Sequence, residues 1–108
     1  MKENSKKKAV RKPLAVVKGF AAVVKDSDGN MFVRTVKSGR ISVRLIDSED
    51  ILMKELLFRD AVMYLSKSVA EMFADQTKRD IFSLSRGNGY RPNPPFEAMA
   101  VPLTFKLG

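Results

Sequence analysis

One long apolar periodicity constrains this fold more than any other feature of the chain. From Asp47 to about Asp75 the apolar residues recur mostly three and four positions apart, which is the period of one helix face. They are Ile51, Leu52, Leu56, Phe58, Ala61, Val62, Leu65, Val69, Met72 and Phe73. No Pro or Gly interrupts the stretch, and Asp47 or Ser48 is a suitable N-cap. The pattern predicts one amphipathic helix of roughly 40 Å. Because a strand of six or seven residues spans only about 20 Å, we expect a partner to cover the rest of the helix.

The segment before this helix carries two turn signals. Residues 26–30 (DSDGN) are typical of a hairpin loop, and Ser38-Gly39 is typical of a two-residue turn. Together they predict three antiparallel strands between residues 14 and 45. The predicted register places Val24 opposite Phe32, Lys25 opposite Met31, Phe32 opposite Leu45, Arg34 opposite Val43 and Val36 opposite Ile41. The alternating sequence from Val101 onward, with Pro102, predicts a final edge strand.

This register sorts the side chains onto two sheet faces, because strand side chains alternate. The predicted core face holds Phe20, Ala22, Val24, Phe32, Val36, Ile41, Val43 and Leu45, with Arg34 the one charged exception. The other face, called here the basic face, holds Ala21, Val23, Lys25, Val33, Thr35, Lys37, Arg40, Ser42 and Arg44. We expect the long helix on the core face and solvent or a ligand on the basic face.

These elements predict an α+β fold. Three or four antiparallel strands, including the C-terminal edge strand, would pack on one long amphipathic helix in an oligomer. The domain boundaries we expect are a basic arm at 1–13, the meander-plus-helix domain at 14–85, and a Gly/Pro-rich extended tail at 86–108. Residues 81–84 suit either a short strand or a last helical turn. The order of arm, meander and helix is loosely similar to the strand-then-helix single-stranded DNA-binding coactivator domains, although no residue motif carries that likeness.

The charge is large and unevenly distributed. The chain has a net charge of +8 over 108 residues. Residues 1–13 carry six basic residues and Glu3, a net +5, and residues 14–46 carry six basic residues against two acids, a net +4. Residues 47–85 have five basic residues and eight acids, a net −3. A basic arm and basic strands beside an acidic helix indicate a polyanion on one side of the fold.

The composition removes much catalytic chemistry. The chain has no Cys and no His, so it lacks thiolate ligands, a Cys nucleophile and the usual general base near neutral pH. The loop at 26–30 resembles the start of a calcium loop, but its glycine falls at the fourth position instead of the sixth. We therefore expect a non-enzymatic protein with no catalytic residue, no cofactor, no metal and no small-molecule substrate.

The sequence favours a small nucleic-acid-binding protein that is weakly sequence-specific. We expect a single-stranded ligand because no recognition helix for a duplex is evident, since the one clear helix is acidic. The candidate contacts combine the arm, the basic face and the loop after the helix. They are Lys6, Lys7, Lys8, Arg11, Lys12, Lys18, Lys25, Lys37, Arg40, Arg44, Arg86, Tyr90 and Arg91. The lysines and arginines would contact phosphates, and Tyr90 would stack on a base. Because the basic face has no aromatic residue, binding there would be mainly electrostatic.

The same sequence features also allow several alternatives. The arm also suits a solubilising tail, the basic face a solvated outer surface, and the 86–96 loop a connector docked on a neighbouring subunit. The second functional hypothesis is a structural subunit of a virion, ribosome or other complex that oligomerises through the long helix and the C-terminal tail. No apolar run approaches the roughly 18 residues of a membrane span. We expect a homo-oligomer, a dimer or larger, located inside the cell or in a virion and not secreted.

Overall fold

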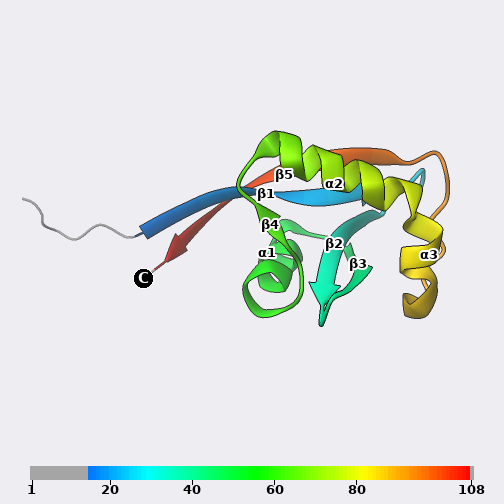
Figure 1. Cartoon of the computed structure of the whole chain (residues 1–108), viewed down its shortest axis with the longest axis horizontal. Helices are drawn as coiled ribbons and strands as arrows, with labels where there is room; N and C mark the ends of the chain where they lie inside the picture. The colour runs from blue at the N-terminus through cyan, green and yellow to red at the C-terminus, as the bar shows by residue number, and fades with distance from the viewer. Residues whose placement is uncertain (1–14, 108) are drawn as a thin grey trace, which may run out of the picture.

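The computed structural model describes residues 15–107, and the side chains of residues 18–87 and 89–104. The arm at 1–13 lies outside the described residues. The chain forms a small α+β domain with a five-stranded antiparallel sheet and helices (Figure 1). In chain order the elements are β1 (Ala15–Lys25), β2 (Met31–Lys37), β3 (Arg40–Ile46), α1 (Glu49–Phe58), β4 (Met63–Tyr64), α2 (Lys67–Arg79), α3 (Ile81–Ser85), the 3₁₀ helix η1 (Arg86–Asn88) and β5 (Glu97–Leu107).

The predicted meander and its register are confirmed. Val24 pairs with Phe32, Arg34 with Val43, and Val36 with Ile41. The Ser38-Gly39 turn has φ angles of 51° and 77°, both in the left-handed region that two-residue hairpin turns require. Ordinary turn chemistry therefore determines how these three strands align.

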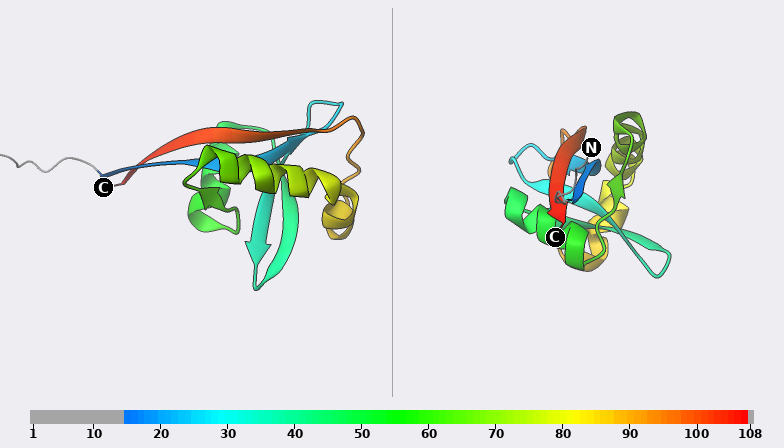
Figure 2. Two further views of the ribbon diagram at one scale, coloured as in Figure 1. Left: turned by 45° about the horizontal axis from the view of Figure 1, so that its top comes forward. Right: turned by 90° about the vertical axis from the view of Figure 1, so that its left-hand side faces the viewer.

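β1 is the central strand of the sheet. β5 pairs with β1 along its whole length, from Ala15–Leu107 to Lys25–Glu97. On its other side β1 pairs with β4 at Phe20 and Ala21 and with β2 at residues 23–25. β2 and β3 then run away from the β1–β5 pair as a hairpin (Figure 2). The predicted C-terminal edge strand is present, starts earlier than Val101, and belongs to the same sheet as the meander.

The single helix predicted for 47–75 is wrong, because two helices occupy this stretch. Ser48 caps α1 by accepting a hydrogen bond from the Ile51 N–H at 3.2 Å, and Ser66 caps α2 in the same way at Val69. Between the helices, residues 61–64 extend along the sheet. Met63 and Tyr64 form β4, and Ala61 bridges to Thr35. Pairing with the open edges of β1 and β2 satisfies backbone groups there, and this tertiary gain outweighs a helical periodicity that has no Pro or Gly to break it.

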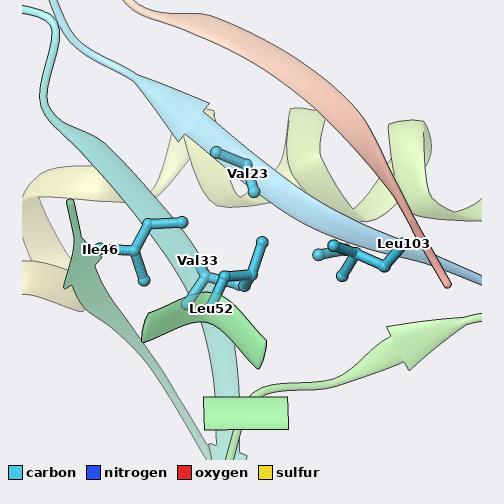
Figure 3. Packing of buried hydrophobic residues seen from close by; sticks show 6 residues of the cluster. Val23, Val33, Ile46, Leu52 and Leu103 are labelled. Carbon is cyan, nitrogen blue, oxygen red and sulfur yellow. The ribbon is translucent and has the colours of Figure 1, made fainter. Parts of the chain in front are cut away.

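Helices cover both faces of the sheet, which corrects the predicted division into a core face and a basic face. Ala21, Val23 and Val33, expected on the basic face, are fully buried with Ile46, Leu52 of α1 and Leu103 of β5 (Figure 3). On the other face, α2 lies against β1 and β5, and Ile81 of α3 joins Val24, Phe32 and Val43. Ile81 and Leu84 of α3 therefore complete the second core. Of the two alternatives expected for 81–84, a short strand or a last helical turn, the structure has the helix.

The far end of the β2–β3 hairpin extends beyond both helical layers. Val36 and Ile41, expected in the core, are 37% and 44% exposed. Leu45 is also 39% exposed. The reason is geometric, since two helices of 10 and 13 residues do not reach the whole of a twisted sheet.

Arg34, the charged residue of the predicted core face, is held in a buried polar and aromatic cluster. Its side chain donates a hydrogen bond to Thr77 Oγ1 at 3.2 Å and lies 4.8 Å from the centre of the Phe73 ring. Phe73 in turn stacks on Tyr64. Burial raises the pKa of the Tyr64 hydroxyl, and the neighbouring Arg34 cation opposes that shift. Arg34 therefore joins β2, β4 and α2, and it is not available to a ligand.

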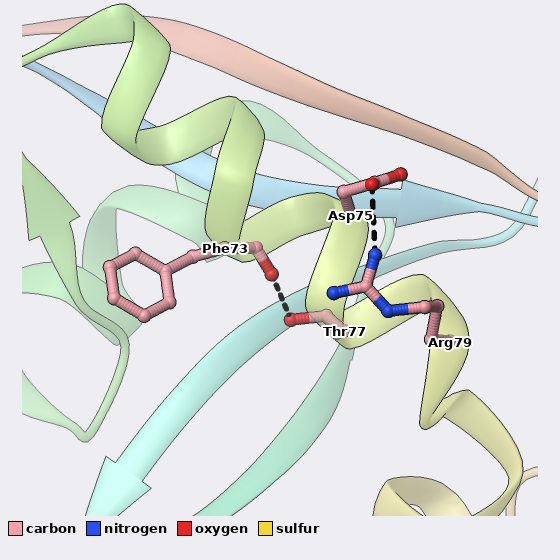
Figure 4. A network of polar contacts seen from close by, with 4 residues as sticks. All are labelled: Phe73, Asp75, Thr77 and Arg79. Carbon is pink, nitrogen blue, oxygen red and sulfur yellow. Dashed lines mark hydrogen bonds and ion pairs between the residues drawn. The ribbon is translucent and has the colours of Figure 1, made fainter.

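α2 turns its smallest residues toward the sheet. Ala70, Ala74 and Thr77 are buried at helical spacing, and the Thr77 hydroxyl donates to the Phe73 carbonyl oxygen at 2.7 Å (Figure 4). On the solvent side of this helix, Asp75 and Arg79 form an exposed ion pair at 3.0 Å (Figure 4). The small residues let the helix axis approach β1 and β5 closely.

Candidate functional site

An open groove of about 640 Å³ lies on the basic face of the hairpin. Its floor consists of β2 and β3, and α3 and η1 form one wall. The lining residues are Thr35, Lys37, Ser38, Arg40, Ile41, Ser42, Arg44, Asp60, Ser83, Leu84 and Gly87. The Ser42 hydroxyl donates a hydrogen bond to the Leu84 carbonyl oxygen at 3.3 Å, which holds α3 against the hairpin.

Two cations stand side by side where this groove reaches the Ser38-Gly39 turn. Lys37 and Arg40 are directly opposite each other across the hairpin, so their side chains leave from the same sheet face. Both are exposed, and within the described part of the chain neither forms an ion pair with an acid. Like charges directly opposite on a strand pair are destabilising. A bound anion would relieve this repulsion.

Arg44 is placed in the groove but is already paired. Its Nε lies 3.2 Å from Oε2 of Glu55, within ion-pair distance but without the alignment of a hydrogen bond. The Glu55 side chain is only 8% exposed, so the acid of this ion pair is buried. Because Glu55 compensates the charge of Arg44, most of the free positive charge of the groove comes from Lys37 and Arg40.

A second hollow of about 350 Å³ lies against α3, η1 and the loop that follows η1. It is lined by Phe82, Ser85, Arg86, Gly89, Tyr90, Arg91 and Pro92. Three predicted contact residues, Arg86, Tyr90 and Arg91, therefore line the same hollow. Tyr90 is half-buried, and its ring packs 5.6 Å from the ring of Phe32. This contact makes Tyr90 part of the core and takes ring surface away from stacking on a base.

Two other predicted contacts, Lys18 and Lys25, lie apart from the groove. Lys18 is opposite Thr104, and Lys25 is opposite Met31 and Glu97 at the end of β1. Neither lines the groove. Lys6, Lys7, Lys8, Arg11 and Lys12 lie outside the described residues. Of the cations predicted on the basic face, the groove therefore holds Lys37 and Arg40 opposite each other, and Arg44, which is paired with Glu55.

The hydroxyl groups and the acid of the groove were not among the residues predicted from the sequence. Thr35, Ser38, Ser42 and Ser83 supply hydroxyls, and Asp60 supplies a carboxylate. The period of two already placed Thr35 and Ser42 on the basic face, so they were available as candidates. No local signal identified Ser83 or Asp60, since the path of residues 59–66 and the position of α3 bring them there.

The loop at 26–30 is held together by hydrogen bonds to one carboxylate. Asp26 is buried, and its carboxylate accepts hydrogen bonds from the backbone N–H groups of Asp28, Asn30 and Asn93. Burial alone raises the pKa of this carboxyl, but the hydrogen bonds from Asn93, Asn30 and Asp28 outweigh burial and leave the pKa below its ordinary value. Across residues 15–107, no cluster of three or more potential metal ligands was found.

No helix among the described residues has both the length and the apolar character needed to cross a membrane. Comparison with protein-family models, curated proteins and solved structures gave no match.

Proposed function

We propose that this chain is a small, non-enzymatic nucleic-acid-binding protein that holds the phosphate backbone of a single strand in the groove of the β2–β3 hairpin. The observation that carries the proposal is the Lys37–Arg40 pair, two exposed cations in direct register with no acid paired to either within the described residues. A phosphate between them would exchange repulsion for two charge-assisted hydrogen bonds.

The lining of the groove supports this ligand class. Thr35, Ser38 and Ser83 add hydroxyl donors around the two cations, and such groups commonly contact phosphate oxygens. The groove contains no aromatic ring, so recognition would be electrostatic and tolerant of sequence. A groove walled by α3 and η1 on one side favours one extended strand over a duplex. The basic arm, with its net +5, would add contacts beyond the groove.

The test is fluorescence anisotropy with labelled single-stranded and duplex DNA and RNA at about 50 and 200 mM salt. Single-strand binding falls with log salt by about 0.7 per neutralised phosphate. Lys37→Gln with Arg40→Gln should therefore reduce the slope by about 1.4. Deleting residues 2–12 should reduce it further.

The matched control is Lys67→Gln with Lys78→Gln, which removes the same charge from exposed positions on α2. It should change binding much less than the groove variant. Equal losses in both variants would show that only the net charge matters. No binding of any nucleic acid at the lower salt would refute the proposal.

The alternative is a structural subunit of a larger assembly. Several large apolar side chains favour it, since Phe58 is 78% exposed, Leu65 80% and Phe82 58%. The long helix expected to mediate oligomerisation does not exist, so any self-association has to use another surface. Size-exclusion chromatography with light scattering separates this alternative from a monomeric nucleic-acid binder.

A further inference from the structure

The two terminal strands form a ribbon that extends beyond the rest of the sheet. On one side of β1, pairing with β4 ends at Phe20, so residues 15–19 pair only with residues 103–107 of β5. Figures 1 and 2 show β1 and β5 leaving the body together at this end. Among the described residues, no third strand joins the ribbon on either edge. A two-stranded ribbon alone is marginally stable in water, and an open strand edge pairs readily with another chain.

The edge that belongs to β1 also borders an exposed apolar side chain. Tyr64 of β4 is opposite Phe20, so the following residue, Leu65, comes at the register position of Gly19, where β4 ends and the open edge begins. Leu65 is 80% exposed. Val69 and Met72 continue the apolar surface along α2 and are 38% and 51% exposed. An open strand edge and an uncovered apolar stripe therefore meet at one place.

We infer that a second copy of this chain occupies this place. In the dimer, residues 16–18 of β1 pair antiparallel with the same residues of the second copy across a two-fold axis at Val17. This dimer gives the structural-subunit alternative a specific partner, a second copy of the chain. It does not depend on nucleic-acid binding.

Self-pairing fits the sequence of this edge. Residues 16–18 read Val-Val-Lys, so the β-branched Val17 stands opposite its own copy and Val16 stands opposite Lys18. No proline interrupts these residues, whereas Pro102 lies within β5. In an antiparallel pair the two basic N-terminal segments, each with a net charge of +5, are attached at opposite ends of the interface. A parallel arrangement would bring these segments to the same end.

The absence of cysteine from the chain allows a direct test of this register. Residues directly opposite in an antiparallel pair have Cα atoms about 4.5–5.5 Å apart, within the range that a disulfide bridges. Val17→Cys should give a covalent dimer under mild oxidation. Ser38→Cys, at the exposed hairpin turn, and Thr104→Cys, on β5, should remain mostly monomeric on denaturing gels.

Light scattering with Leu65→Glu gives a second measurement that needs no cross-link. We expect the unmodified chain to be a dimer and this substitution to raise its dissociation constant by about tenfold or more. Leu57→Glu on α1, where Leu57 is 51% exposed, is the matched control and should leave the dimer intact. Circular dichroism establishes that each variant is folded.

The inference is overturned if the unmodified chain is monomeric at all concentrations. It is also overturned if Thr104→Cys or Ser38→Cys cross-links as fast as Val17→Cys, or if Leu65→Glu and Leu57→Glu behave alike. Because these assays measure mass, they give the same answer whether or not the Lys37–Arg40 groove binds nucleic acid.

Discussion

A single added methyl group at Gly19 tests the path of the chain between the two helices. Gly19 is buried in β1 beside β4. A Cβ placed there would lie 2.5 Å from Met63 Cγ, 2.7 Å from Met63 Sδ and 2.9 Å from the Tyr64 carbonyl oxygen. The Met63 side chain is flexible and can turn aside, but the Tyr64 carbonyl belongs to the backbone of β4. Gly19→Ala therefore requires β4 to move away from β1.

We expect this substitution to lower the free energy of unfolding by about 1–3 kcal/mol, the usual cost of overpacking a close contact. With an m value of about 1–3 kcal/mol/M in urea, the midpoint should fall by roughly 1 M. Urea unfolding followed by circular dichroism measures the change. Combining Gly19→Ala with Met63→Ala should recover part of the loss and give a coupling energy of about 0.5–3 kcal/mol, because only the side-chain contact is relieved.

Gly87→Ala is the control, since no atom lies within 4 Å of its Cβ position and its φ is ordinary. It should be neutral or stabilise by up to about 1 kcal/mol. If residues 47–75 were one continuous helix, Met63 and Tyr64 would not lie against Gly19. A near-neutral Gly19→Ala, or strict additivity with Met63→Ala, would therefore refute the placement of β4.

Three further predictions concern charged groups. Arg40→Glu turns a like-charge pair with Lys37 into an opposite-charge pair, so it should stabilise the fold by about 0.2–1 kcal/mol in urea titrations while weakening nucleic-acid binding; a loss of stability would contradict the assigned register. Asp26→Asn should lower stability by about 1–3 kcal/mol at neutral pH. Because the folded pKa of Asp26 is depressed, this difference should be present above the unfolded value of 3.8 and disappear as the pH falls through the lower folded pKa; a difference independent of pH would count against the hydrogen-bonded carboxylate. Arg44→Met should cost about 1–3 kcal/mol because it leaves the Glu55 carboxylate buried without its cation, whereas Arg44→Met with Glu55→Met should recover most of the loss. If the double variant were as unstable as the sum of both single variants, the two groups would not be coupled.

The part of the fold that could be predicted from sequence is the part set by neighbours along the chain. Residues 26–30 and Ser38-Gly39 specify their turns locally, and the turns align β1, β2 and β3 without reference to anything distant. The N-cap at Ser48 was visible for the same reason. The second N-cap, at Ser66, was not predicted, because the apolar period continues past it with no Pro or Gly to mark a break.

The candidate site was predictable only in part. The period of two brought Lys37, Arg40 and Arg44 to one face, and all three line the groove. The compensation of Arg44 by Glu55 was not visible, because it depends on α1 packing over that face. Tyr90 was predicted to lie in a loop and stack on a base, yet its ring packs against Phe32, which is 58 positions away in sequence.

By itself the sequence determined the strands of the meander, their turns and register, and the surplus of positive charge, because each depends on residue types and short spacings. The tertiary structure alone decided where the long apolar stretch divides, which sheet face each helix covers, and which cations remain unpaired. The reason is that an open edge of β1 offers backbone hydrogen bonds to any segment that can reach it. Residues 61–64 form these hydrogen bonds in place of helical ones. As a result, α1 packs on the sheet face that the alternating pattern had assigned to solvent or a ligand.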